Sequence, residues 1–194
     1  DMSVQLTGLT RRDLETLWQD AAVTPAGPRP AVYDNASIMA YAEGDPSEAF
    51  GEPYKVFDRE RFIARLPRPP YKFLDRIVAT EAEPWVMRAG GTIEAEYDIP
   101  PGEWYFASNR QESMPFSILL ETALQPCGWF SAYMGSPLTS DKDLHYRNLG
   151  GTATQHLPVT PDMGTLATRV RCTGVSSSGG MIIQNFHFDM TNKG

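Results

Sequence analysis

The sequence has no apolar run that approaches the roughly 20 residues needed to span a bilayer, and it is poor in cysteine and positive charge. Its two cysteines, Cys127 and Cys172, lie in apolar surroundings without a CxxC motif or a histidine-rich neighbour. A disulfide scaffold or zinc site is therefore not expected, and both are predicted to be buried, reduced thiols. With 17 basic against 24 acidic residues the net charge is -7, which disfavours nucleic acid or an anionic membrane as a partner.

A signal peptide is also missing, because the first residues do not show a basic stretch followed by an apolar one. Together these absences predict a cytoplasmic protein. What is present is an ordinary globular composition, with 194 residues, 41% of them hydrophobic and 21% charged. This predicts one domain with a real core, or one domain with an appendage.

The distribution of proline and glycine predicts three segments. Residues 1–34 are expected to hold a helix at 11–22 followed by a stiff, Pro-rich linker. Residues 35–65 are expected to form an extended lead-in, with a short helix at 37–41 and loop elsewhere. The main domain is expected to cover residues 66–194, entered through the Pro-rich stretch 66–77.

Alternating hydrophobic patterns predict the strands of the main domain. Residues 91–99 alternate apolar and acidic side chains, as a strand with one wet face does. Residues 144–157 predict a further strand with a Gly-Gly interruption. Residues 165–175 and 181–190 flank a Ser- and Gly-rich turn, which predicts a hairpin.

Residues 114–135 (MPFSILLETALQPCGWFSAYMG) predict a long helix that is apolar on nearly every side. A proline stands near its start, a glycine at its end, and a kink is expected at Pro126. A helix of this kind must be surrounded by other structure. A strand, a buried helix and then several strands predict an α+β fold of the hot-dog type, in which an antiparallel sheet wraps around one central helix.

Three polar residues, Ser117, Glu121 and Gln125, follow one another at intervals of four and form one line along this helix. Glu121 is its only charged residue. An unpaired carboxylate is costly to bury, so Glu121 should either lose its charge or face a cavity with partners. A carboxyl group kept protonated in an apolar cleft suits a general acid. Alternatively, the line is the solvent face of an amphipathic helix, although such a face normally carries several charges.

Residues 104–125 (WYFASNRQESMPFSILLETALQ) resemble the active-site segment of the bacterial 3-hydroxyacyl carrier-protein dehydratases. In that family an aromatic cluster precedes a small residue and the catalytic His, a Met-Pro pair opens the central helix, and a carboxylate and a Gln lie one turn apart on it. Met114-Pro115 match the pair, while Glu121 and Gln125 fall on the carboxylate and the Gln. The resemblance also implies that substrate is bound by residues around them, namely Trp104, Phe106, Met114, Phe116 and Ser117.

Three further blocks, residues 37–67, 120–135 and 143–151, resemble in the same order the dehydratase region of polyunsaturated fatty acid synthases and iterative polyketide synthases. Those megasynthases carry tandem hot-dog units. The resemblance implies no cofactor of the chain's own, because the substrate is carried on the phosphopantetheine of an acyl carrier protein. It also implies a second hot-dog unit as partner, in the same polypeptide or in a homodimer.

The sequence departs from the family at its catalytic base, because Asn109 occupies the position of the His. An Asn amide has no lone pair that titrates near neutral pH, so it cannot remove the α-proton of a 3-hydroxyacyl thioester. Phe116 also stands where the family has a Gly. The chain's own histidines, His145, His156 and His187, lack the family spacing, and structural or surface roles are expected for them.

Two hypotheses of function follow from this departure. In the first, the chain supplies Glu121 and Gln125 to a dehydratase site whose His comes from a partner hot-dog unit. In the second, it is an inactive pseudo-dehydratase that serves as a scaffold or binds the acyl chain or carrier protein. A thioesterase, which also occurs on this fold, has no support in the residues.

The resemblance further implies one more strand after the predicted hairpin. The domain is therefore expected to lack its last strand, or to receive it from another chain. An open sheet edge favours association, so tight pairing with another hot-dog unit is expected.

Overall fold

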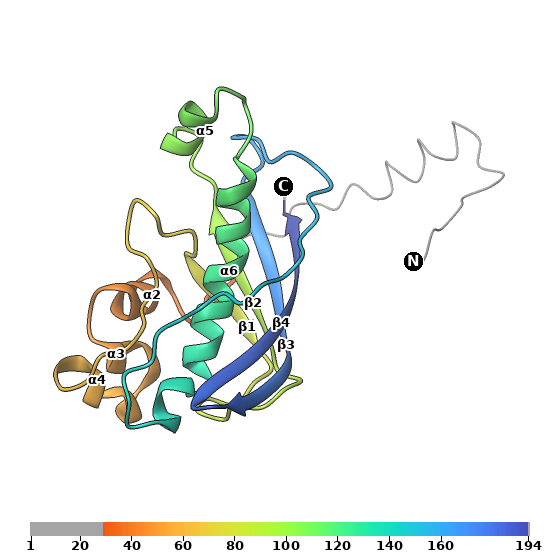
Figure 1. Cartoon of the computed structure of the whole chain (residues 1–194). Helices are drawn as coiled ribbons and strands as arrows, with labels where there is room; N and C mark the ends of the chain where they lie inside the picture. Colours follow the sequence, from red (N-terminus) through yellow and green to blue (C-terminus); the bar gives the residue numbers. More distant parts are fainter. Residues whose placement is uncertain (1–28, 194) are drawn as a thin grey trace.

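The computed structural model describes residues 29–193 and shows an α+β arrangement (Figure 1). The helix predicted at 11–22 lies outside the described residues. The elements, in chain order, are α2 (Asn35–Ala42), α3 (Pro46–Phe50), η1 (Glu52–Tyr54), α4 (Val56–Arg59), β1 (Arg76–Thr80), β2 (Thr92–Asp98), α5 (Trp104–Asn109), α6 (Phe116–Tyr133), η2 (Ser136–Thr139), β3 (Thr165–Ser178) and β4 (Met181–Asn192).

The four strands form one antiparallel sheet in the order β1-β2-β3-β4. The strand predicted at 91–99 and the predicted hairpin are both present. Ile93 pairs with Val170, and both point into the core, where they are 1% and 0% exposed. The hairpin strands run further than predicted, so only Gly179 and Gly180 remain in the turn. Both have positive φ (58° and 81°), which suits a tight turn between twisted strands.

The outer face of the sheet is less exposed to solvent than the alternating pattern of residues 91–99 predicted. Glu96 on β2 is only 3% exposed, because cations from three other segments cover it. Its carboxylate accepts hydrogen bonds from Arg76 Nε (2.9 Å), Arg29 (3.1 Å) and Lys193 Nζ (3.2 Å). Burial favours the neutral form of Glu96, but the bonds from Arg29, Lys193 and Arg76 outweigh it and hold the pKa below its usual value.

Helix α6 packs against β2, β3 and β4 and runs unbroken through Pro126. It ends before Gly135, whose φ of 84° and closeness to Trp85 exclude a side chain, since a Cβ there would lie 2.9 Å from Trp85 Cα. Its last turns, from Trp129 to Tyr133, are buried throughout, as predicted. The N-terminal half keeps an exposed or half-buried face, because the sheet packs on its other side through Ile118 and helices α2 to α4 lie beside the far half of α6 (Figure 1).

The lead-in at residues 35–65 is helical, so the prediction of an extended segment is wrong. The short helix predicted at 37–41 is present within α2, which Asp34 caps by accepting a hydrogen bond from the Ser37 amide. The predicted loop instead forms α3, η1 and α4. Apolar residues spaced along it pack into the core against Trp129 and Phe130 of α6. Tertiary burial therefore overrides the high loop propensity of its Gly and Pro residues.

Residues 141–160, which we call the crossing segment, contain no strand, so the strand predicted at 144–157 is wrong. The segment crosses in front of α6 in Figure 1, and Tyr146 is hydrogen-bonded to the helix at Gly128 O (2.8 Å). At its far end Met114 N donates to Val159 O (2.7 Å). Between residues 147 and 157, no described segment offers its backbone as a pairing partner, and a strand cannot form alone.

Candidate functional site

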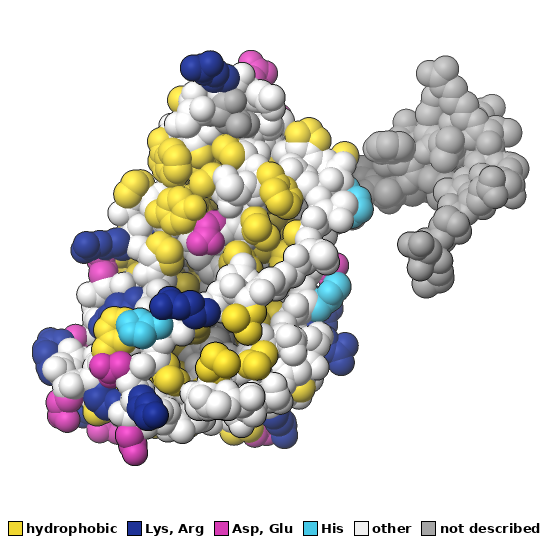
Figure 2. Space-filling view, in the orientation of Figure 1, with side chains coloured by type: hydrophobic (Ala, Val, Ile, Leu, Met, Phe, Trp, Pro, Cys, Tyr) yellow, Lys and Arg dark blue, Asp and Glu magenta, His cyan; other side chains and the backbone are white. Residues whose placement is uncertain are grey.

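Glu121 lies on the open face in the N-terminal half of α6. The side chains on this face are Phe116, Ser117, Leu120, Glu121 and Leu124, followed by Gly128, and all are half-buried or exposed. Figure 2 shows that hydrophobic side chains gather over this part of the molecule. Glu121 is therefore a carboxyl group set in an apolar surface, rather than one charge on a generally solvated helix.

No described residue forms a hydrogen bond or ion pair with the Glu121 carboxyl group. Its partial burial is uncompensated, and this desolvation raises its pKa above the usual value. A group in this setting holds its proton more readily than an ordinary surface Glu does. That property allows it to donate a proton to a leaving group.

Gln125 lies one turn further along but points inward. It is 3% exposed, its Oε1 accepts from Phe73 N (2.7 Å), and its Nε2 donates to Tyr71 O (2.9 Å). The amide therefore fastens the entry stretch before β1 onto the central helix. The predicted polar line of Ser117, Glu121 and Gln125 accordingly runs from solvent into the core, with Glu121 at the boundary.

The five residues expected to contact substrate divide into two groups. Met114 (2% exposed) and Phe106 (9%) belong to the buried cluster at this end of the molecule. Phe116, Ser117 and Trp104 are exposed. Trp104 Nε1 donates to Pro70 O (3.2 Å), which holds the indole against the entry stretch. The exposed three offer surface to a ligand, whereas the buried two support the start of α6.

Asn109 is the last residue of α5, and the chain turns there through Arg110, which adopts a left-handed conformation (φ 54°). The short link that follows leads to Met114, whose amide is held by Val159 O. The residue at the family His position is thus placed at the end of a helix, close in sequence to the start of α6. An asparagine at this place still cannot act as a base.

The three histidines lie in three different surroundings. His145 packs against Phe62, with ring centroids 4.6 Å apart. His187 lies on β4, where its Nε2 is 3.3 Å from the Asp189 carboxylate. His156 lies in the crossing segment and lines a hollow beside the start of α6.

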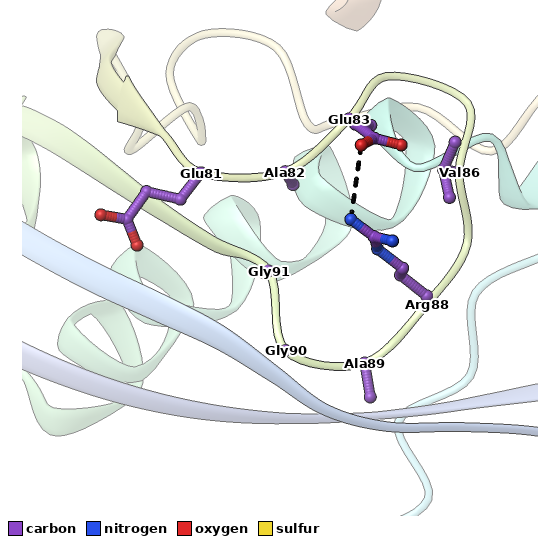
Figure 3. A pocket seen from close by; sticks show the side chains of 8 residues that line it. All are labelled: Glu81, Ala82, Glu83, Val86, Arg88, Ala89, Gly90 and Gly91. Carbon is purple, nitrogen blue, oxygen red and sulfur yellow. Dashed lines mark hydrogen bonds and ion pairs between the residues drawn. The ribbon is translucent and has the colours of Figure 1, made fainter.

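That hollow is an open depression at the N-terminal end of α6. Polar side chains from two segments line it, together with Met114, Pro115, Phe116, Leu157 and Pro158; the polar ones are Gln111, Ser113, Gln155 and His156. A second hollow lies within the β1–β2 loop, residues 81–91, where Glu83 and Arg88 approach each other at 3.4 Å (Figure 3). All its lining residues come from that one loop, and Glu121 lines neither hollow.

The described residues contain no group of three His, Cys, Asp or Glu side chains placed to hold a metal ion. Among the described helices, none is both long and apolar enough to cross a membrane. Cys127 and Cys172 are free, buried thiols, as predicted. Burial raises the pKa of Cys127 to about 12, so this thiol is not a nucleophile at neutral pH.

Comparison with known families identifies the family to which this sheet and central helix belong. The model of the FabA-like domain matches residues 66–193. The chain belongs to this family. Its sheet and central helix are therefore the hot-dog fold, as predicted, and the predicted family resemblance is confirmed.

The FabA-like domain is also similar to part of a megasynthase. It is 30% identical over 169 residues to a polyunsaturated fatty acid synthase subunit of Thraustochytrium sp. (strain ATCC 26185 / S-3). The similar region covers 82% of this chain but 11% of that protein, so the chain spans a small part of its relative's length. It is thus a dehydratase-like domain related to one section of a fatty acid synthase.

Sequence reasoning missed two features of this FabA-like domain that shape the open face. One is Tyr146, whose hydroxyl is bonded to α6 and to Tyr41. The other is Arg61, which donates to the carbonyl oxygens of Ser140 (2.6 Å) and Lys142 (3.1 Å). A pattern of alternating residues could not show the contact of Tyr146 with Tyr41 or that of Arg61 with Ser140, because these pairs lie 105 and 79 positions apart.

Proposed function

We propose that this chain supplies the carboxylate half of a 3-hydroxyacyl-thioester dehydratase site in a fatty acid or polyketide synthase. The substrate is a 3-hydroxyacyl group on the phosphopantetheine arm of an acyl carrier protein. The observation that carries the proposal is Glu121, an unpartnered carboxyl group in an apolar face with its pKa raised by burial. A purely structural helix gains nothing from such a group, because its desolvation is uncompensated.

The reaction divides between two hot-dog units, which belong to one polypeptide or to two paired chains. A His of the partner takes the α-proton of the substrate, since Asn109 cannot do so. The electron pair of the broken C–H bond forms the α,β double bond, and the bond from the β-carbon to the hydroxyl oxygen breaks. Glu121 gives its proton to the departing hydroxyl, and the products are water and the trans-2-enoyl thioester.

Gln125 supports this site by position rather than by contact with the reacting atoms. Its amide oxygen accepts from the backbone of Phe73 and its amide nitrogen donates to that of Tyr71, and it thereby fixes the segment beside the turn that carries Glu121. Such support keeps a catalytic side chain within a narrow range of positions.

A second candidate is a pseudo-dehydratase that pairs with an active unit as a scaffold or as a binder of acyl chain or carrier protein. Two residues favour it: Asn109 at the His position, and Phe116 where the family has Gly, which adds bulk at the start of α6. Phe116 is 46% exposed, so its ring lies on the surface that a thioester would approach.

The deciding experiment expresses the chain together with its partner hot-dog unit and measures dehydration of 3-hydroxyacyl thioesters. Glu121→Gln should lower kcat/KM by about 10²–10⁴-fold, because the general acid is lost. Glu60→Gln, at an exposed site on the lead-in, is the matched control and should leave the rate unchanged. Full activity in Glu121→Gln would favour the scaffold over the catalytic half-site.

A further inference from the structure

The open face of α6 ends abruptly at Gly128. From Trp129 to Pro137 every residue is buried, because the lead-in helices cover this half of the helix. Before Gly128, Leu120, Glu121 and Leu124 lie half-buried on the same face. The inward turn of Gln125 removes its amide from this surface. An apolar strip therefore runs from Glu121 to Gly128 and stops there.

Tyr146 of the crossing segment stands at the point where the strip stops. Its hydroxyl donates to Gly128 O (2.8 Å) and lies 3.1 Å from the hydroxyl of Tyr41. Its ring lies beside the helix at Gly128, since a Cβ on that residue would be in ordinary contact with Tyr146 Cε2, at 3.8 Å. The ring itself remains accessible, and the residue is 41% exposed. The ring of Tyr146 thus lies against α6 at Gly128, where the strip stops.

Contacts with the lead-in fix the position of Tyr146 at the end of the strip. Tyr41 is 0% exposed and its hydroxyl also donates to Ala64 O (2.6 Å). Arg61 donates to the backbone of Ser140 and Lys142, and Phe62 packs on His145. The residues just before Tyr146 are therefore fastened to the lead-in.

The other end of the strip has a different character. Beyond Glu121, towards the start of α6, lies the open hollow lined by Gln111, Ser113, Gln155 and His156. These side chains suit the amides and hydroxyl groups of a pantetheine arm, which need hydrogen-bond partners when they leave water. A hydrocarbon tail has no such need and gains from contact with Leu124.

We propose that Tyr146 sets the length of the acyl chain accepted at this site. The tail lies on the strip that runs past Leu124 to Gly128, and the pantetheine arm lies over the hollow at the start of α6. This role of Tyr146 rests on the proposed function, because that function places the reacting carbons of the substrate at Glu121. Seven residues separate Glu121 from Gly128, about 10 Å along a helix, so the strip holds a tail of moderate length before it meets the tyrosine ring.

The test measures kcat/KM for short-, medium- and long-chain 3-hydroxyacyl pantetheine thioesters on the chain paired with its partner unit. Tyr146→Ala should move the preference towards longer chains by about tenfold, because each methylene placed in an apolar site is worth roughly that factor or more. Tyr146→Phe keeps the ring and should keep the preference. Leu149→Ala, 73% exposed in the same segment, is the matched control and should change nothing.

Leu124→Trp tests the path of the tail without disturbing Tyr146. A larger side chain halfway along the strip should shift the preference towards shorter chains. If both Tyr146→Ala and Leu124→Trp dehydrate substrates with an unaltered chain-length profile, the inference is wrong while the proposed function stands. That outcome is expected if side chains of the partner, rather than an acyl tail, cover the strip.

Direct binding separates failure of this inference from failure of the proposed function. If no variant and no substrate shows dehydration that depends on Glu121, the affinity of the same thioesters is measured instead by calorimetry. In the expected result the affinity rises with chain length up to a limit, and that limit moves to longer chains in Tyr146→Ala. This result supports binding of the acyl tail on the strip even if the chain catalyses no dehydration. Affinity independent of chain length overturns it.

Discussion

At Glu121 the surroundings alone set the proton affinity, because no described side chain stabilises its charge. Glu96 shows the opposite case in the same domain. It is more deeply buried, yet three cations hold its pKa below the usual value. The two carboxyl groups differ in their partners, and only Glu121 is left in a state that favours the proton. This contrast is the physical reason for regarding Glu121 as an acid and Glu96 as a structural anion.

The raised pKa of Glu121 predicts a dependence of stability on pH. The folded protein keeps this proton at pH values where the unfolded chain has released it, so the contribution to stability is full below the unfolded pKa and is lost as pH rises through the folded one. Glu121→Gln cannot ionise. Its free energy of unfolding relative to the unaltered protein should therefore increase from about pH 4 upward and then level off, as measured by urea unfolding at a series of pH values.

Glu60→Gln provides the control, because this side chain is exposed. Its difference from the unaltered protein should stay nearly constant over the same range. A constant difference for Glu121→Gln as well would show that the carboxyl group is fully hydrated in solution, and it would remove the physical basis for its role as an acid.

At this scale the sequence could show that Glu121 is unusual, because it is the one charge between Met114 and Gly135. It could not show that Gln125, four residues later, is turned away from it. The direction of Gln125 follows from two backbone groups, on Tyr71 and Phe73, that the core would otherwise leave unpaired. Long-range satisfaction of such groups is not encoded in a local pattern.

Among the elements, α6 and the stretch before β1 depend on each other through Gln125. Gln125→Leu removes both hydrogen bonds and leaves the amide of Phe73 buried without a partner. We expect a loss of about 2 kcal/mol in the free energy of unfolding, since an unsatisfied buried group costs about 1–3 kcal/mol. Denaturant unfolding measures it.

Thr122→Val is the companion variant, also in the buried part of α6. Thr122 Oγ1 donates only to Ile118 O of its own helix (2.9 Å), a carbonyl that the helix already uses, so the loss should be smaller than for Gln125→Leu. Equal losses in the two variants would mean that Gln125 does not fasten the entry stretch.

The elements differ in how far local sequence determines them. The hairpin of β3 and β4 could be predicted because alternation and a Gly-Gly turn act within one stretch of chain. The crossing segment has the same kind of sequence but no neighbouring strand, and it stays irregular. The lead-in has the proline and glycine of a loop, yet its aromatic residues fold into short helices once α6 is there to bury them. In both cases the outcome depends on whether a distant part of the chain supplies a partner, and a local pattern does not show this.

For the whole molecule, the family match begins at residue 66, but the core begins earlier. Phe50, Tyr54 and Phe57 of the lead-in share one buried cluster with Trp129 and Phe130 of α6. The lead-in is therefore part of the folded unit and not a linker to it. A boundary drawn from the family match alone would cut through the hydrophobic core.

A chain that starts at residue 66 should consequently fail to fold cooperatively, because it exposes the apolar side of α6 that the lead-in covers. Near-ultraviolet circular dichroism and dye binding should show lost side-chain packing relative to the 194-residue chain.

In the 194-residue chain, Phe50→Ala (5% exposed) should cost about 3–5 kcal/mol, whereas Phe62→Ala (46% exposed) should cost far less. If the chain that starts at residue 66 folds cooperatively and is stable, the lead-in is not part of the folded unit.

The carboxylate of Glu96 connects the two ends of the described region mechanically. Arg29 and Lys193, 164 positions apart in the chain, both bind its Oε1. These two side chains thus tie both ends of the described region to one carboxylate on β2. In a longer polypeptide, tension between the preceding and following regions would act across this ion cluster first and would pull on β4 and the stretch before α2 together.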